Sequence, residues 1–215
     1  MKFPQKAQNH GMTLFEVLLV IACIAILAAL LLPALAAAKV KRARINCVSN
    51  LNQIALALKA WEGDHYDKFP VQFAATNDLE LKRLAEGRSV WPWQVCSNEL
   101  NSTKIFVCPE DTLHFPATRF ESLTGSNISY FLNLDISDVY PNMIMAGDDN
   151  LLLNDHPVQS RIMVPTARDM VKWDRTRHNG CGNVSMADGS VQQWTSTMLA
   201  NAITNSAATN RWIIP

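Results

Sequence analysis

An uninterrupted apolar run from residue 17 to residue 38 constrains this 215-residue chain more than any other feature. None of the side chains in the run is charged. At a helical rise of about 1.5 Å per residue, the run spans roughly 33 Å, the thickness of a bilayer's hydrocarbon layer. A buried helix of a globular protein rarely holds so long an apolar segment. The run is therefore either a cleavable secretory signal or a retained membrane helix.

The residues that flank the run favour a retained membrane helix over a cleavable signal. A secretory signal has a basic start and an apolar stretch of about 7–15 residues. Here the stretch is longer, and the carboxylate of Glu16 stands at its front edge. A charge beside hydrocarbon is costly, which makes Glu16 a candidate functional residue. The small residues that close the run leave cleavage near Ala38 as the open alternative.

The remainder of the chain has the composition of a water-facing domain. Hydrophobic residues make up 48% of the whole and charged residues 18%, which excludes a disordered chain. Lys plus Arg and Asp plus Glu number 19 each, so the formal net charge is zero. This balance argues against a nucleic-acid binder. From about residue 65 onward there is enough chain to bury a core.

Helical periodicity continues beyond the apolar run. Apolar residues recur at steps of three and four between residues 39 and 61, and no helix breaker occurs before Gly63. They are Val40, Ala43, Cys47, Val48, Leu51, Ile54, Ala55 and Leu58. We therefore expect one long helix over about 13–62, including Pro33, which would kink it. The fold class is predicted to be α+β, with this helix packed on a small antiparallel sheet.

Short elements are predicted after the long helix. Further helices are expected at 79–85, 91–100 and 197–203. Strands are expected at 104–107, 128–133, 143–146, 151–153, 161–164, 183–187 and 190–194. Asp188-Gly189 between the last two strands is a strong signal for a two-residue hairpin turn.

The start of the chain resembles the prepilin leader of type IV pilins and type II secretion pseudopilins. The basic residues Lys2 and Lys6 precede Gly11, Thr13-Leu14 follows, and Glu16 stands five residues after the glycine. Met12 occupies a position where Phe is commoner in the family. The resemblance implies cleavage after Gly11 by a prepilin peptidase and methylation of the new amine on Met12. It also implies that Glu16 meets the amine of a neighbouring subunit in a filament, and that Pro33 kinks the helix.

The resemblance further implies a location and partners. The protein would cross the inner membrane once, with a cytoplasmic N-terminus and a periplasmic globular domain. Its partners would be the peptidase, other pilin or pseudopilin subunits, an inner-membrane assembly platform and membrane lipid, with no nucleic acid. The positive-inside rule predicts the opposite orientation, because Lys39, Lys41, Arg42 and Arg44 follow the membrane run. We follow the family and expect this basic cluster to sit on anionic headgroups.

A second resemblance is to pilin-like proteins of verrucomicrobia and planctomycetes. They share a Cys-x-x-Asn-Leu-x-Gln pattern, present here from Cys47, a Phe-Pro pair and a later Cys-Pro, present at Cys108. A further shared motif is His178 followed, after nine residues, by Asp188-Gly189. In an oxidising periplasm, the four cysteines outside the membrane allow three pairings. The family motifs favour Cys47–Cys108, with Cys96–Cys108 as the alternative.

Three groups of residues are candidate sites that also have structural explanations. His178 and Asp188 suggest catalysis or metal binding, but we expect Asp188 to serve the turn and His178 to bond backbone near residues 180–182. Asp148 and Asp149 suggest a calcium site, although the spacing of a twelve-residue calcium loop is missing and two such residues in a turn are usually solvated. Cys108, His114, His178 and Cys181 are candidate zinc ligands, but their spacing in the sequence matches no standard zinc motif.

These observations predict a structural subunit of a type II secretion pseudopilus or type IV pilus. Its segments would be a cleaved leader (1–11), a membrane and filament-core helix (12–38), an amphipathic continuation (39–62) and a globular domain (63–215). No nucleophile elbow, phosphate loop or HExxH helix occurs, and neither enzymatic activity nor a cofactor is expected. The alternatives are a Sec-exported soluble binding protein or enzyme cleaved near Ala38, and a minor pilin with a ligand-binding, adhesin-like domain.

Overall fold

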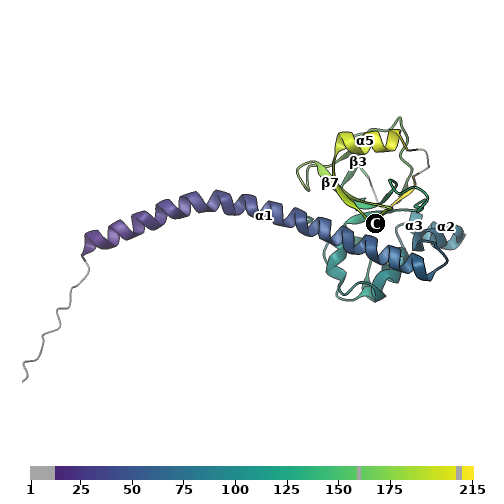
Figure 1. Ribbon diagram of the computed structural model, residues 1–215, viewed down its shortest axis with the longest axis horizontal. Coiled ribbons are helices and arrows are strands. Elements are labelled where there is room, and N and C mark those ends of the chain that lie inside the picture. The colour runs from purple at the N-terminus through teal and green to yellow at the C-terminus, as the bar shows by residue number, and fades with distance from the viewer. Residues whose placement is uncertain (1–12, 159–160, 207–209) are drawn as a thin grey trace, which may run out of the picture. The chain divides into compact units, whose positions relative to one another are not determined.

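The computed structural model describes residues 13–158, 161–206 and 210–215 (Figure 1). The chain divides into two compact units, Met1–Arg42 and Ala43–Pro215. The α-helices are α1 (Leu14–Asp64), α2 (Pro70–Thr76), α3 (Asp78–Ala85), α4 (Trp91–Gln94) and α5 (Ser196–Thr204). The 3₁₀ helices are η1 (Val95–Asn98), η2 (Thr103–Phe106), η3 (Phe120–Ser122) and η4 (Gly125–Asn127). The strands are β1 (Tyr130–Asn133), β2 (Ile144–Asp148), β3 (Leu151–Leu153), β4 (His156–Pro157), β5 (Arg161–Met163), β6 (Val171–Trp173), β7 (Cys181–Met186), β8 (Val191–Thr195) and β9 (Trp212–Ile214).

The long helix forms as predicted. Helix α1 continues through Pro33 without ending there. It stops after Asp64, where Tyr66 and Asp67 adopt left-handed φ values of 59° and 54° that no helix can continue. Within the second unit, its periodic apolar face is buried from Cys47 onward. The α+β architecture with a long helix packed on an antiparallel sheet is therefore confirmed.

Two antiparallel sheets make up the β structure. The larger has the strand order β5-β9-β1-β2-β7-β8, and the smaller has the order β4-β3-β6. Strand β1 lies at the centre of the large sheet and pairs Phe131 with Gly147 of β2 and Leu132 with Ile213 of β9. The large sheet thus joins segments that are more than eighty residues apart, which the sequence did not predict.

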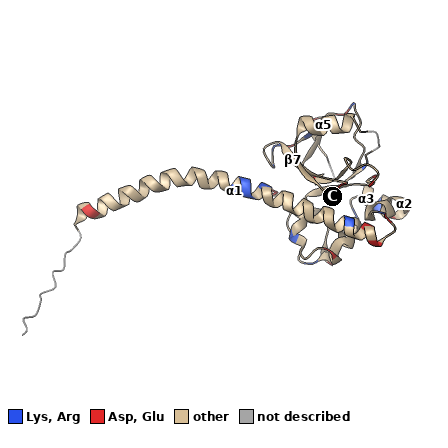
Figure 2. Cartoon of the chain, in the orientation of Figure 1, with Lys and Arg blue, Asp and Glu red and all other residues tan. Residues whose placement is uncertain are grey.

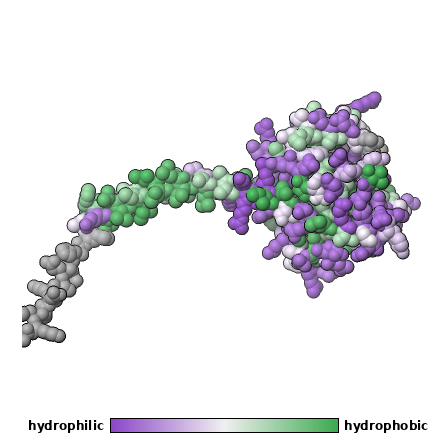
Figure 3. All heavy atoms as spheres, in the orientation of Figure 1, coloured by the Kyte–Doolittle hydropathy of each residue, from purple (hydrophilic) through white to green (hydrophobic). Residues whose placement is uncertain are grey.

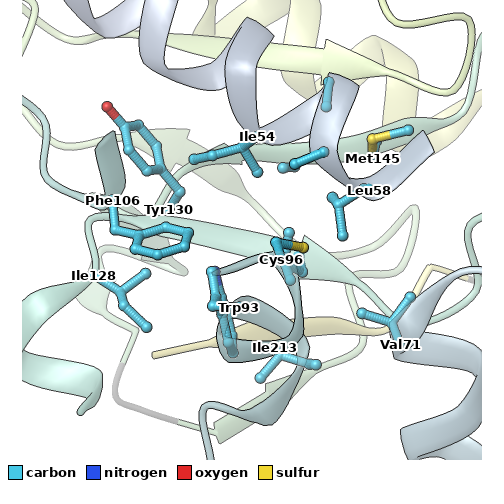
Figure 4. Close-up of a cluster of buried hydrophobic side chains, with 14 of the residues drawn as sticks. Ile54, Leu58, Val71, Trp93, Cys96, Phe106, Ile128, Tyr130, Met145 and Ile213 are labelled. Atoms are coloured by element: carbon cyan, nitrogen blue, oxygen red, sulfur yellow. The ribbon is translucent and has the colours of Figure 1, made fainter. Parts of the chain in front are cut away.

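Strands β1, β2 and β9 of the large sheet are buried throughout, and successive side chains on a strand point to opposite faces. Tyr130 and Leu132 pack with the apolar face of α1, whereas Phe131 packs on the other face with Trp212. Figure 4 shows the first cluster, in which Ile54 and Leu58 of α1 lie among side chains from β1 and the short helices. The second cluster contains side chains from α5 and the small sheet. Each fully buried large apolar side chain contributes about 1.5–3 kcal/mol, so both clusters stabilise the sheet.

Most of the predicted short elements occur close to their expected positions, with two corrections. Residues 104–107 were predicted as a strand but lie mostly in η2, because Ser102 caps that turn by accepting a hydrogen bond from the Lys104 amide at 3.3 Å. The β7–β8 hairpin turns at Asp188-Gly189, but its loop is longer than two residues, because three residues lie between Met186 and Ser190, whose amide and carbonyl are hydrogen-bonded at 2.8 Å. Gly189 supplies the left-handed residue, with a φ of 87°, that such a loop requires.

Candidate functional site

The first turn of α1 is closed by a reciprocal pair of hydrogen bonds between Thr13 and Glu16. Oε2 of Glu16 accepts from the Thr13 amide at 2.7 Å and from the Thr13 hydroxyl at 2.9 Å. The Glu16 amide in turn donates to Oγ1 of Thr13 at 3.3 Å. This is a capping box, which satisfies helix N–H groups that have no partner within the helix. The carboxylate of Glu16 is therefore held at the helix start. Gly11 and Met12 lie outside the described residues.

The segment after Glu16 exposes its apolar side chains all around the helix. Figure 2 shows no charged residue between Glu16 and the basic cluster that begins at Lys39, and Figure 3 shows the same stretch as continuously hydrophobic. Among the described residues, α1 is long and apolar enough to cross a membrane. An 18-residue apolar segment of this helix has a mean hydropathy of 3.0, and none of its residues is buried. Exposed apolar surface of this extent requires a lipid or protein partner.

One member of the basic cluster belongs to the globular unit. Arg44 donates from its guanidinium to the backbone carbonyl of His178 at 2.6 Å. This bond ties the second half of α1 to the segment that carries the His178 motif. Arg44 thus has a role within the fold, whereas we had expected it to sit on headgroups with the rest of the cluster.

A second candidate site is a buried cluster formed by Cys47, Cys108, Asp148 and His178. One ligand-type atom from each side chain lies within 4.8 Å of the others. The Cys47 thiol donates to Oδ1 of Asp148 at 3.2 Å, and Nε2 of His178 lies 3.2 Å from Sγ of Cys108. Nε2 of His178 also lies 3.5 Å from Oδ2 of Asp148. All four residues are at most 1% exposed.

Four separate elements bring these side chains together. Cys47 lies on the buried face of α1, Cys108 follows η2, Asp148 ends β2 and His178 precedes β7. His178 has a left-handed φ of 50°, and Asn179 and Gly180 continue in the same region. For a residue other than glycine this conformation is uncommon and persists only where the surroundings enforce it. The His178 amide supplies part of that enforcement, because it donates to Oε2 of Glu110 at 2.7 Å.

The cluster shifts the pKa values of its two thiols in opposite directions. Hydrogen bonds from Cys47 and from His178 lower the pKa of Cys108 to about 6, against the opposing effect of burial. Burial raises the pKa of Cys47 well above its ordinary value, and Cys108 and Asp148 add to that effect. Burial also raises the pKa of Asp148. Cys108 is therefore the thiol that carries thiolate character beside the His178 ring.

Asp149 belongs to a different network from Asp148. Arg177, which is 6% exposed, pairs with Asp149 and with Oδ2 of Asp111, the latter at 3.0 Å. Nδ1 of His114 lies 2.8 Å from the same Asp111 oxygen. The two carboxylates considered as a calcium pair thus have different partners. Both are buried, which corrects the expectation of a solvated turn.

The remaining candidate residues from the sequence lie at several different positions in the fold. Oδ1 of Asp188 accepts from the Ser190 amide at 2.8 Å in the exposed hairpin turn. The backbone carbonyl of His178 accepts a hydrogen bond from the Cys181 amide at 3.3 Å, as expected near this loop, while the His178 ring contacts side chains of the cluster. Of the four residues considered for zinc, Cys108 and His178 come together, and His114 lies with Asp111. All five cysteines are free thiols, and Cys47 and Cys108 are neighbours within the cluster.

Several residues of these sites were not identified from the sequence. Thr13 was missed as a cap, although its spacing from Glu16 is the capping-box signature. Tyr130 and Asn183 carried no sequence signal, because the pairing of β1, β2 and β7 places them beside the cluster. Glu110 and Arg177 are close in sequence to Cys108 and His178 but were not assigned a role.

Comparison with known proteins concerns the N-terminal segment. Residues 6–32 match the family described as Prokaryotic N-terminal methylation motif. The chain thus carries a prepilin-type signal followed by a hydrophobic helix. No curated protein and no solved structure matches it. The motif makes the chain pilin-like and implies processing by a prepilin peptidase, a membrane anchor and assembly partners in general terms.

Proposed function

We propose that this protein is a structural, non-enzymatic subunit of a type II secretion pseudopilus or type IV pilus. In this proposal the peptidase cuts after Gly11 and the amine of Met12 is methylated. The helix then holds the subunit in the inner membrane, with the globular unit in the periplasm, until assembly. The observation that carries the proposal is the methylation motif at residues 6–32, which extends into an apolar segment of α1 with no buried residues.

The apolar segment of α1 supports assembly through helix packing. In lipid the hydrophobic effect does not drive helices together, so packing and polar contacts must select the arrangement. Glu16 is the acidic residue in the first turn of α1, at the start of the apolar segment that is free to pack on other helices. A buried charge is tolerated only when it is paired, so pairing of Glu16 with the amine of a neighbouring Met12 would fix the register of subunits.

A minor subunit with a binding domain is the second candidate. A cleft of about 500 Å³ is lined by apolar and amide side chains from the β1–β2 connection, β7, β8, α5 and the last strand. Trp194 and Tyr140 are among the lining residues. This volume lies within the range of small-molecule sites. In such a subunit the same helix would anchor the protein in the filament, and the cleft would bind the ligand.

The mass of the N-terminal peptide of the membrane-extracted protein tests the main proposal. We expect a peptide that begins at Met12 and carries one additional methyl group. Gly11→Leu is expected to block cleavage, because a side chain hinders the backbone at the scissile bond, whereas Gly63→Ala should be processed normally. A mature peptide that begins near Lys39 would remove the apolar helix and Glu16 and would overturn the proposal.

A further inference from the structure

We propose that Cys47, Cys108, Asp148 and His178 bind one zinc ion. Two thiolates, an imidazole and a carboxylate are all ligand types that bind zinc in proteins. All four side chains are buried, as the closed coordination of a structural site requires. Calcium and magnesium prefer sets of oxygen ligands, so the two sulfur atoms select a softer metal. This site is independent of the filament function proposed above.

The separations of the ligand atoms fit tetrahedral coordination. Bonds of about 2.0–2.3 Å to zinc place neighbouring ligand atoms of a tetrahedron roughly 3.3–3.8 Å apart. Nε2 of His178 lies 3.2 Å from Sγ of Cys108 and 3.5 Å from Oδ2 of Asp148. Sγ of Cys47 lies 3.2 Å from Oδ1 of Asp148. The remaining ligand atoms are within 4.8 Å of one another, so shifts of about 1 Å or less complete the set.

An outer layer of hydrogen bonds orients the proposed ligands. Asn183 donates from its backbone and side-chain nitrogens to Oδ2 of Asp148 at 2.7 and 3.0 Å. Its side chain also lies 3.3 Å from Sγ of Cys47, and the Tyr130 hydroxyl donates to the same sulfur at 3.4 Å. Nδ1 of His178 lies 3.1 Å from Oε2 of Glu110, near enough for an ionic contact but without the geometry of a hydrogen bond. A carboxylate beside the distal nitrogen of a histidine is the usual support for a histidine that ligates metal.

The charges around the cluster call for a cation. Asp148 is fully buried, and its ion-pair partner among the described residues is His178. The nearby guanidinium of Arg177 is engaged by Asp111 and Asp149. A buried carboxylate beside two thiols is costly unless a positive charge compensates it. A divalent ion in the centre of the four side chains supplies that charge.

Two other uses of the cluster fit the structure less well. A catalytic cysteine requires access for its substrate, yet Cys108 and His178 are at most 1% exposed. A disulfide between Cys47 and Cys108 needs a separation of about 2.05 Å between the sulfur atoms, and it would leave Asp148 and His178 without a function in the cluster. Zinc uses all four side chains. It would join α1 to the segment after η2, to the end of β2 and to the segment before β7.

The test uses the full-length protein in detergent, stripped of metal with a chelator under reducing conditions. Zinc chloride and cobalt chloride are the probes, with metal content, cobalt absorption and thermal unfolding as readouts. We expect one metal ion per chain, a thiolate-to-cobalt charge-transfer band and the absorption of tetrahedral cobalt. With zinc at about 1,000 times its dissociation constant, Tm should rise by roughly 10 °C.

Single substitutions test which side chains bind zinc. Cys108→Ser and His178→Gln should lose zinc, whereas Cys96→Ser should bind it normally, because the Cys96 thiol donates to the Pro92 carbonyl outside the cluster. Tyr130→Phe keeps the ring and removes one outer hydrogen bond, so its zinc affinity should fall about tenfold. Should the ligand variants fail to fold, zinc-dependent protection of Cys47 and Cys108 from alkylation in the unmodified protein provides the same evidence.

Two results would overturn the proposal. One is a full-length protein that binds neither zinc nor cobalt, with both cysteines equally reactive in the presence and absence of metal. The other is a Cys47–Cys108 disulfide found by non-reducing peptide mapping of protein taken directly from the membrane. That second result would establish the covalent link between the helix and the sheet that the family motifs suggested.

Discussion

Oε2 of Glu16 accepts hydrogen bonds from both the amide and the hydroxyl of Thr13, at 2.7 and 2.9 Å. The carboxylate therefore caps its own helix before any neighbouring subunit is present. Assembly through Glu16 would exchange these bonds for one to an amine of another chain. The role of the side chain as a cap and its role as a charge can be separated experimentally, because glutamine also serves at the third position of a capping box.

We predict that Glu16→Gln and Glu16→Ala both leave the protein inserted in the membrane and unassembled. Glutamine retains the cap but has no charge to pair with an amine. Thr13→Ala keeps the charge and should still assemble, with a loss of helix stability of about 1 kcal/mol. Sedimentation and electron microscopy of sheared filaments measure the outcome. Normal filaments from Glu16→Gln would show that capping, and not charge pairing, is what assembly requires.

Gly182 is the position in β7 where a side chain is least tolerated. A Cβ atom there would overlap the indole ring of Trp173, which is 3% exposed. Gly182→Ala is therefore expected to lower the free energy of unfolding by about 2 kcal/mol. Gly63 is the matched control, since a Cβ added to it meets nothing within 4 Å and alanine favours the helix by about 0.5 kcal/mol. Urea unfolding followed by tryptophan fluorescence compares the two, and equal effects would contradict the packing argument.

The carboxyl group of Glu62 makes stability depend on pH. Burial raises the pKa of Glu62 from 4.5 to about 7, and so do the hydrogen bond that the protonated Glu62 donates to Asp138 and the negative charge of Asp138. Between these two values the folded state binds more protons than the unfolded state, so the free energy of unfolding falls as pH rises. Glu62→Gln should stabilise the protein more at about pH 8 than at about pH 5, by on the order of 1 kcal/mol. The exposed Glu121→Gln variant should show no such difference in urea titrations at the two pH values.

The sequence predicted the elements whose signals are local. The periodic face of α1 and the Asp188-Gly189 turn lie in contiguous segments, and both occur in the structure. Strands β6 and β9 have three residues each and were missed, although β3 and β5, which are equally short, were predicted. The helix α2 was missed as well, although Pro70 stands at its start, where proline is favoured.

The candidate cluster was only partly predictable. Cys47, Cys108, Asp148 and His178 were each singled out from the sequence, but for three different roles. Their meeting depends on the β2–β7 pairing, which places Gly147 opposite Val184, and on the left-handed turn at His178. Neither the pairing nor the turn has a local signal, because both are set by packing between segments that are distant in sequence. Spacing rules for zinc motifs therefore do not apply to a cluster whose members come from four separate elements.

Arg177 provides the final prediction, because it neutralises two buried carboxylates. Its guanidinium pairs with Asp111 and Asp149, and the Arg177 side chain is 6% exposed. Arg177→Met removes the cation and leaves both carboxylates buried, at an expected cost of about 3–5 kcal/mol in the free energy of unfolding. Arg211, which pairs with Asp135 at 2.6 Å but is 38% exposed, is the matched control, and Arg211→Met should cost about 1 kcal/mol or less. Urea unfolding of both variants measures the difference, and equal costs would show that burial of the Arg177 network does not set its contribution.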